Sequence, residues 1–216
     1  MKVTSVNLGE KRSINWRGQE IETGIFKFPV QSSIRLGKED VDNDNVIERK
    51  YHGGIDKACY IYSADHYSYW EKLYPDLDFK PGMFGENITI EGLDEAKIFI
   101  GDIFQIGGAK VEVSQPREPC YKLGFRFDTQ KVLKQFLNAP YPGVYLRVIE
   151  EGNVNVGDKL ELIEKGYNFA NLAETYRLAF HADNSEQDNL QKILGIGNLP
   201  EGFKQTLEKR LALIKQ

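Results

Sequence analysis

Cys120 is the side chain of this sequence with the clearest potential for chemistry. It lies within residues 115–122, where two prolines stiffen the chain and remove backbone hydrogen-bond donors. Arg117 and Lys122 are cations close to it in sequence, and a nearby cation favours the thiolate, which is both nucleophile and metal ligand. We therefore expect a rigid loop that leaves a strand over residues 110–114. A reactive thiol and an inert, buried thiol both remain open at this point.

The other cysteine, Cys59, is not expected to carry chemistry. It lies in the apolar stretch 58–62, a pattern typical of a strand, in which a free cysteine packs as a small hydrophobic residue. Two cysteines cannot build a disulfide framework or a four-cysteine zinc or iron–sulfur site. The chain also has three histidines, so any chemistry must come from very few side chains.

A second group of candidate residues lies in the segment 50–57, which reads Lys-Tyr-His-Gly-Gly-Ile-Asp-Lys. Gly53 and Gly54 permit positive φ and close approach of a ligand to the backbone. Their amide groups can form an anion-binding nest to which Lys57 adds charge, and His52 can donate to the same ligand or take up a proton. The alternative is a plain loop between two strands, with His52 hydrogen-bonded to the backbone.

A third group lies in the segment 81–87, where glycines flank a turn and a polar pair, Glu86 and Asn87, enters a strand. Asn87 can read the hydrogen-bonding edge of a ring. Glu86 can bind a basic ring nitrogen or hold a backbone amide. The alternative is a turn in which both side chains satisfy local backbone groups.

Composition and missing motifs exclude several classes of protein. The 216 residues carry a formal net charge of −4 and are 28% charged and 41% hydrophobic, which is typical of a globular protein and argues against a dedicated nucleic-acid binder. The signatures of P-loop hydrolases, Gly-x-Ser-x-Gly esterases, His-Glu-x-x-His metalloproteases and dinucleotide-binding folds are absent. Neither an apolar run of about 18 residues nor a signal-peptide core occurs, so we expect a cytoplasmic protein without a membrane span.

The elements that must position these motifs are mainly strands. Apolar residues alternate over 110–113, and this stretch follows 103–106 across two glycines, which predicts a hairpin. Arg17 and Gly18 predict a turn within the first pair of strands. Many short strands with glycine-rich turns favour a barrel or a sandwich. The further strands are expected over residues 2–8, 13–16, 21–28, 58–62, 87–90, 143–149 and 159–163.

Two helices are expected between these strands. One runs over residues 63–73 with Ser63 as its cap, and the other over 128–138 with Asp128 as its cap. A polar loop over residues 38–50, rich in Asp and Asn, lies beside the candidate site motifs.

After about residue 165 the pattern becomes helical. Apolar residues at helical spacing predict a helix over 168–181. Ser185 with Asp188 resembles a capping box for a second helix, which Gly195 closes, and Pro200 suits the first turn of a third. We therefore predict an α+β protein of two domains, a mainly β domain over residues 1–164 and a three-helix domain over residues 165–216.

Taken together and in this order, the three groups of candidate residues resemble the MOSC domain, a family named for the C-terminal domain of molybdenum-cofactor sulfurases. The resemblance is greatest to its bacterial YiiM-type branch, which is linked to resistance to 6-hydroxylaminopurine. It covers nearly the whole chain, including the helical tail, which resembles the three-helix domain of that branch. The stretches that carry it are 52–57, 67–70, 84–87, 92–93, 101–104, 114–117 and 119–123.

The resemblance implies a β-barrel-like core that binds molybdenum cofactor, a molybdopterin, and reduces N-hydroxylated compounds such as N-hydroxylated nucleobases to amines. On this interpretation Cys120 is the catalytic residue that ligates the metal, because a soft thiolate suits molybdenum–sulfur chemistry. The metal and the pterin perform the redox step. His52 is the catalytic proton donor when the N–O bond breaks. The residues implied to bind the cofactor are Lys27, Gly53, Gly54, Lys57, Glu86, Asn87, Arg117 and Lys122.

The same resemblance implies an electron-donor protein or reductase as a partner, and we also expect a homodimer. Family descriptions associate MOSC proteins with pyridoxal phosphate through the other domain of the sulfurases. One departure from the family is visible. Members carry a Gly-Asp-x-Gln-like segment before His-Gly-Gly, whereas this chain has Val-Asp-Asn-Asp-Asn over 41–45, in which Asp42 is the expected equivalent.

Two other functions compete with this interpretation. In the first, Cys120 carries a persulfide or hands on the cofactor without turnover. In the second, the helical tail binds nucleic acid. Residues 165–216 hold seven basic and six acidic residues, a weak charge that is more typical of a packing or dimerisation element.

Overall fold

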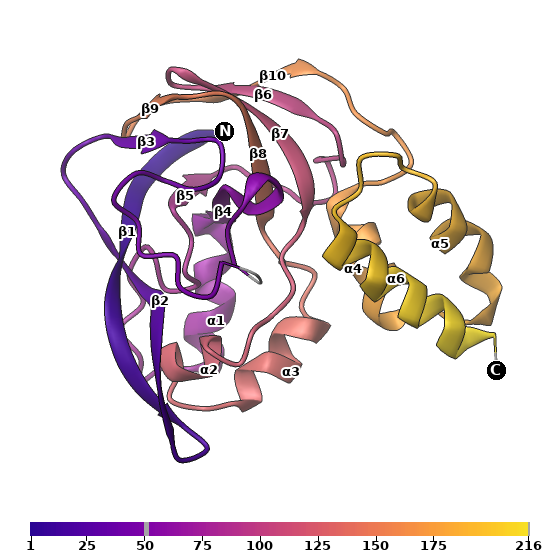
Figure 1. Cartoon of the computed structure of the whole chain (residues 1–216), viewed down its shortest axis with the longest axis horizontal. Helices are drawn as coiled ribbons and strands as arrows, with labels where there is room; N and C mark the ends of the chain where they lie inside the picture. The colour runs from indigo at the N-terminus through magenta and orange to yellow at the C-terminus, as the bar shows by residue number, and fades with distance from the viewer. Residues whose placement is uncertain (50–51, 216) are drawn as a thin grey trace.

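The computed structural model describes residues 1–49 and 52–215. Its largest element is an eight-stranded sheet in the order β10-β6-β7-β8-β4-β5-β1-β2, in which β4 and β5 are parallel and all other neighbours are antiparallel. A separate two-stranded sheet is also present (Figure 1). The strands of the large sheet are β1 (Lys2–Trp16), β2 (Gln19–Pro29), β4 (Cys59–Ser63), β5 (Ile88–Glu91), β6 (Ile103–Ile106), β7 (Ala109–Pro116), β8 (Val144–Glu150) and β10 (Leu160–Glu164), and those of the small sheet are β3 (Ile34–Leu36) and β9 (Gly152–Val154).

Local turn chemistry builds the two hairpins that the sequence predicts. Arg17 and Gly18 both have positive φ, 53° and 82°, as in the two-residue turns whose twist suits antiparallel strands. Ile106 pairs with Ala109 across the two glycines of the second hairpin. The other predicted strands are confirmed as well, with small shifts at their ends, and β1 joins its two predicted stretches into one strand.

The predicted barrel is not confirmed, because the described strands do not close into a ring. The sheet ends in two edge strands, β10 and β2. The start of β1 nevertheless approaches the start of β10. The amide of Val3 donates to the carbonyl of Asp158 at 2.8 Å, and the amide of Leu160 donates to that of Met1 at 3.0 Å. The sheet is therefore curled, as Figure 1 shows, and α1 to α3 lie together toward one end of it.

Two details of the strands differ from the prediction. β7 continues to Pro116, which pairs with Val144, so the rigid loop of the site begins at Arg117 and not at residue 115. Proline is tolerated there because it is the last residue of its strand. The second difference is that β3 and β9 were not predicted. They have three residues each, which is too few to show an alternating pattern.

The helices between the strands are α1 (Tyr67–Leu73), α2 (Leu123–Arg126) and α3 (Lys131–Asn138). Neither predicted cap is correct. Ser63 ends β4, and its hydroxyl donates to the Asp65 carboxylate at 3.3 Å, while a 3-10 turn (Ala64–His66) precedes α1. Asp128 has a φ of 50°, and the position before α3 belongs to Gln130. Both predicted helices exist, but they begin later than the cap residues indicate.

A buried aromatic cluster fastens these helices to the sheet. Trp70 of α1 and Phe136 of α3 stack with their ring centres 5.8 Å apart, and both pack near Phe84. The indole N–H of Trp70 donates to the hydroxyl of Tyr62 at 2.7 Å, so its polar atom is satisfied in the core. Tyr60 belongs to the same cluster and extends it to the candidate site.

The helical tail consists of α4 (Leu172–His181), α5 (Gln187–Leu194) and α6 (Glu201–Ile214), as predicted, and they lie together at one side of the molecule (Figure 1). Asn171 caps α4 by accepting from the amide of Glu174 at 2.9 Å. The predicted capping box at residues 185 and 188 is wrong, because Asp183 and Glu186 form it instead, on a 3-10 turn (Asn184–Glu186) before α5.

One apolar core runs from the sheet into the tail. Val111 and Leu146 of the sheet belong to the same buried cluster as Leu172, Leu190 and Phe203 of the helices. The division into two domains at residue 164 stays a prediction, since the two parts share this core. Within the described part of the chain, no helix is both long enough and apolar enough to cross a membrane.

Candidate functional site

A cavity lies where β2, β4 and β8 meet the loop before residue 57 and the loop that follows β7. It comprises about 700 Å³ of space when the part that is continuous with solvent is included. Most of the site residues predicted from the sequence converge on it. Eight of the ten line its wall: Lys27, His52, Gly53, Lys57, Asn87, Arg117, Cys120 and Lys122.

Glycines allow the backbone segments of this wall to approach one another. A Cβ atom on Gly24 would lie 1.6 Å from the carbonyl oxygen of Asn45, so β2 can touch this loop only because residue 24 has no side chain. Gly53 has a φ of 92°, and a Cβ there would lie 2.8 Å from Val46. The 3-10 turn that follows (Ile55–Lys57) places Lys57 in the wall just before β4 begins.

Cys120 and His52 face each other across the cavity. The Sγ atom of Cys120 lies 3.6 Å from Nε2 of His52, and the cysteine is half-buried. Burial, together with the neighbouring charges of Lys122 and Lys57, lowers the pKa of His52 to about 4. At neutral pH the imidazole of the ligand-free protein is therefore uncharged. An anion bound beside it would favour the protonated ring.

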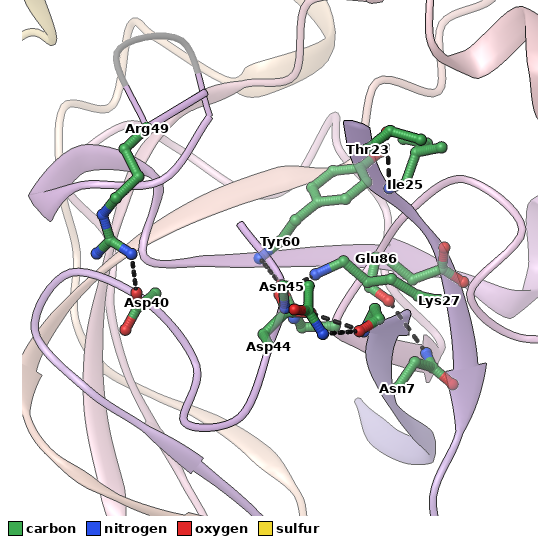
Figure 2. Close-up of polar contacts among 12 residues, drawn as sticks. Asn7, Thr23, Ile25, Lys27, Asp40, Asp44, Asn45, Arg49, Tyr60 and Glu86 are labelled. Atoms are coloured by element: carbon green, nitrogen blue, oxygen red, sulfur yellow. Dashed lines mark hydrogen bonds and ion pairs between the residues drawn. The ribbon is translucent and has the colours of Figure 1, made fainter. Parts of the chain in front are cut away.

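The sheet side of the cavity is a closed network of polar groups. The ammonium of Lys27 pairs with the carboxylate of Asp44 (Figure 2). Nδ2 of Asn87 donates to the same oxygen at 2.9 Å. The amide of Gly9 donates to the other oxygen at 2.7 Å. Burial alone would raise the pKa of Asp44, but Lys27 and these donors lower it below its ordinary value. Asp44 therefore remains charged, and the expected equivalent of the family residue, Asp42, lies outside the cavity.

The loop side is held by a different ion pair. Nζ of Lys122 lies 2.5 Å from Oε2 of Glu48, whose backbone has a φ of 58°, a conformation uncommon for a residue other than glycine. Lys57 lies on this side as well, with its ammonium 5.7 Å from the centre of the Tyr145 ring. Burial lowers the pKa of Lys57, although the charges of Glu118 and other acids oppose this.

Arg117 gives the most direct indication that the cavity suits an anion. Its guanidinium carbon is buried 5.0 Å from the centre of the Tyr60 ring and 5.3 Å from that of Phe136. Among the described residues its buried Nη1 finds no acceptor. A buried charged donor without an acceptor is costly, and a bound anion that accepts from it would remove this cost. The cavity wall carries four cations, Lys27, Lys57, Arg117 and Lys122, against two carboxylates, Asp44 and Glu118, while Glu48 lines the space that adjoins it.

Two of the predicted binding residues lie outside the cavity wall. Glu86 is fully buried and accepts from the amides of Gly82 and Phe84 at 2.7 and 3.0 Å and from the hydroxyl of Thr89 at 2.9 Å. Of the two roles open from the sequence, the structure shows Glu86 holding backbone amides. The amide of Gly54 donates to the carbonyl of Glu39 at 2.8 Å, so this part of the predicted nest is already occupied.

Several residues of the site were not predicted from the sequence. Asp44 and Glu48 lie in the polar loop that the composition placed beside the site, but nothing local distinguishes them from its other acids. Tyr60 and Tyr145 are partners in the register of β4 and β8, a pairing that the chain alone does not reveal. Glu118 stands two residues before Cys120 and is the one that the local sequence could have indicated.

The protein side chains do not form a metal cage of their own. Across residues 1–49 and 52–215, no group of three or more His, Cys, Asp and Glu could hold a metal ion. The cavity can therefore offer a metal one soft ligand, the thiolate of Cys120, and the other ligands would have to come with the metal.

Comparison with known proteins identifies the family. The sequence model of the MOSC domain matches residues 48–161. The chain belongs to the MOSC domain family. It is 33% identical over 190 residues to the protein YiiM of Escherichia coli, covering 87% of this chain and 84% of that one, and 36% identical over 208 residues to the uncharacterized protein YflK of Bacillus subtilis, covering 96% and 93%.

A solved structure supports the same branch. The crystal structure of YiiM from Geobacillus stearothermophilus matches with a TM-score of 0.80 at 32% identity, over 97% of this chain and 98% of that one. The predicted YiiM-type branch of the MOSC family is thereby confirmed. A protein of Gibberella moniliformis named a reductase is 37% identical over 154 residues, which is 69% of this chain but 27% of that protein.

Proposed function

We propose that this MOSC protein binds the molybdenum cofactor and reduces N-hydroxylated compounds, such as N-hydroxylated nucleobases, to amines. The observation that carries the proposal is the convergence of one half-buried thiol, Cys120, with four cations on a single cavity. Membership of the MOSC family and the reductase name of one relative support it.

The residues present fit this cofactor. Molybdenum bound by a pterin dithiolene accepts a further soft ligand, and the thiolate of Cys120 is such a ligand. The pterin phosphate requires charge-assisted hydrogen bonds, for which the unpartnered Nη1 of Arg117 is a donor already in place. Lys57 and Lys122 add positive charge on the same side as Cys120. When bound, the cofactor supplies the two electrons of the reduction.

The side chains of this chain then have separate tasks. Reduction of a hydroxylamino group breaks one N–O bond, consumes two electrons and two protons, and releases the amine and water. His52 holds one proton at Nε2, 3.6 Å from the sulfur, once a bound anion has raised its pKa from the low value of the ligand-free site. Tyr60 and Tyr145 form the aromatic side of the cavity, with ring centres 5.1 Å apart, and restrict water there.

Electrons must reach the cavity from outside, because the chain has no residue that stores them. We propose a separate electron-donor protein as the source. The relative named a reductase supports this, since the segment similar to this chain takes up about a quarter of its length and the remainder is room for further parts.

The test is a reduction assay on protein produced in a host that makes the cofactor. With 6-hydroxylaminopurine as substrate and a chemical electron donor, we expect turnover to adenine, and a loss of at least about 100-fold in Cys120→Ala. Cys59→Ala is the matched control, because Cys59 is buried in the core and lies outside the cavity. Full activity in Cys120→Ala would contradict the assigned role.

A second function is favoured by one observation. The sulfur of Cys120 next to an uncharged imidazole is also the arrangement of a thiol that is activated for sulfur transfer. In that case the protein carries a persulfide or hands on the cofactor without turnover. Mass spectrometry of the protein as isolated separates the two, since a persulfide on Cys120 without molybdenum supports the carrier. Nothing in the described site supports the family association with pyridoxal phosphate.

A further inference from the structure

The last helix of the tail is tied directly to the site loop. The hydroxyl of Thr206, on α6, donates to Oε1 of Glu118 at 2.6 Å, and its other acceptor, the carbonyl of Gly202, is more distant at 3.4 Å. Glu118 stands between Arg117 and Cys120 in the loop and lines the cavity. Thr206 thus fixes a charged group of the site although it lies 88 residues after Glu118 in the chain.

A second contact ties the same part of the tail to the other site loop. Arg147 of β8 donates to the carbonyl of Asn198, just before α6, and to Oδ1 of Asp56 at 2.5 Å. Glu112 accepts from both Arg147, at 3.0 Å, and the Asn198 amide, at 2.7 Å. Asp56 adjoins Lys57, so residues 198–206 hold the two loops that carry Lys57 and Arg117.

Glu118 differs from the other two carboxylates at the site, Asp44 in the cavity wall and Glu48 beside it. Asp44 is paired with Lys27 and Glu48 with Lys122, whereas the hydrogen bond of Glu118 comes from a neutral hydroxyl. A neutral donor fixes the position of a carboxylate without cancelling its charge. The direction in which Glu118 points therefore affects the electrostatic potential at Arg117 and at the sulfur of Cys120.

We infer that Thr206 is a positioning residue of the site. Its hydroxyl holds the Glu118 carboxylate against α6, and so limits the repulsion between that carboxylate and an anion bound beside Arg117 and Cys120. Without the hydroxyl the carboxylate turns toward the cations of the cavity and competes with the anion. This inference rests on the anion-binding, thiol-bearing site of the proposed function, and it assigns the helical tail a part in that site.

The experiment uses the full chain and inorganic phosphate as the anion. The rate of Cys120 alkylation by iodoacetamide is followed by mass spectrometry at fixed pH and rising phosphate, which gives a protection constant. Thr206→Val removes the hydroxyl at nearly constant volume, and we expect about five- to tenfold weaker protection, the effect of one ordinary hydrogen bond. Thr206→Ser restores the wild-type constant. Gln205→Ala, which removes a bond within α6 only, leaves it unchanged.

A second variant allows the inference to be tested even if Thr206→Val folds poorly. Glu118→Gln removes the charge, so it binds phosphate more tightly than the wild type, and adding Thr206→Val to it produces no further change. Equal protection in the wild type, Thr206→Val and Glu118→Gln would overturn the inference alone. A wild-type thiol that phosphate does not protect would overturn the proposed anion site, and the inference with it.

Discussion

The two sides of the cavity contain ion pairs of the same chemistry in different settings. On the sheet side, the side chains of Lys27 and Asp44 are 10% and 2% exposed, and Asp44 accepts three further hydrogen bonds. On the loop side, Lys122 is 4% exposed but Glu48 is 44% exposed. Glu48 also has a backbone conformation with positive φ.

This difference separates a fixed wall from one that can open. Separating Asp44 from Lys27 would leave two buried charges unpaired in an apolar interior, which is costly. Glu48 is half-exposed, so its carboxylate can turn into solvent when an external anion takes its place beside the buried ammonium of Lys122. The cations that face Cys120 can then exchange an internal carboxylate for an external anion.

The largest expected effect is on the sheet side. Asp44→Ala leaves Lys27 buried without its counter-ion and leaves Asn87 without an acceptor, so the free energy of unfolding falls by about 3–5 kcal/mol. Urea denaturation of the purified protein measures this. A loss below about 1 kcal/mol would show that this wall is no more rigid than the loop side.

The next effect is on pH dependence in the cofactor-free protein. The pKa of His52 is about 4 when folded and near 6.5 otherwise, so between these values the unfolded chain binds more protons. Stability therefore falls by about 2–3 kcal/mol as the pH falls from 6.5 to 4. The pKa of Asp44 is also lowered, but its contribution is lost below about pH 4, in a separate range.

Urea denaturation at pH 6.5 and 4.5 compares the wild type with His52→Gln. We expect the variant to lose less stability between these two values, since glutamine does not titrate. Equal losses in both proteins would show that His52 is not the group responsible.

The smallest effect in free energy concerns Glu48. Glu48→Gln removes the internal counter-ion of the buried Lys122, so phosphate protects Cys120 about fivefold more tightly. The free energy of unfolding falls by about 1–2 kcal/mol, less than in Asp44→Ala, because Glu48 is half-exposed. The alkylation assay and urea denaturation together test this. If phosphate protected Cys120 no better than in the wild type, or if the loss of stability were as large as in Asp44→Ala, Glu48 would be as firmly held as Asp44.

The sequence predicted the parts of the fold that depend on neighbouring residues. The turn at Arg17 and Gly18 and the hairpin before β7 follow from local turn chemistry, and the helices of the tail follow from their apolar spacing. Helix starts were predicted less well. Ser63 and Asp128 are acceptable caps in isolation, but Ser63 ends β4 and bonds to Asp65, and the backbone of Asp128 has a positive φ.

Seven of the eight predicted residues in the cavity wall lie in the family motifs, and they were predicted for that reason and not because their positions in space could be derived. Lys27 lies outside those motifs. The choice of Asp44 over Asp42 depends on which acid meets Lys27 of a distant strand. The role of Glu86 depends on a turn that brings two amides to one carboxylate. The contact of Thr206 with Glu118 depends on how the tail packs, and no local pattern indicates it.

The metal content of freshly purified protein from a cofactor-producing host tests the central claim most directly. We expect molybdenum close to one per chain in the wild type and in Cys59→Ala, and a loss of most of it in Cys120→Ala. Molybdenum retained at the wild-type level in Cys120→Ala, or absent from the wild type, would contradict it.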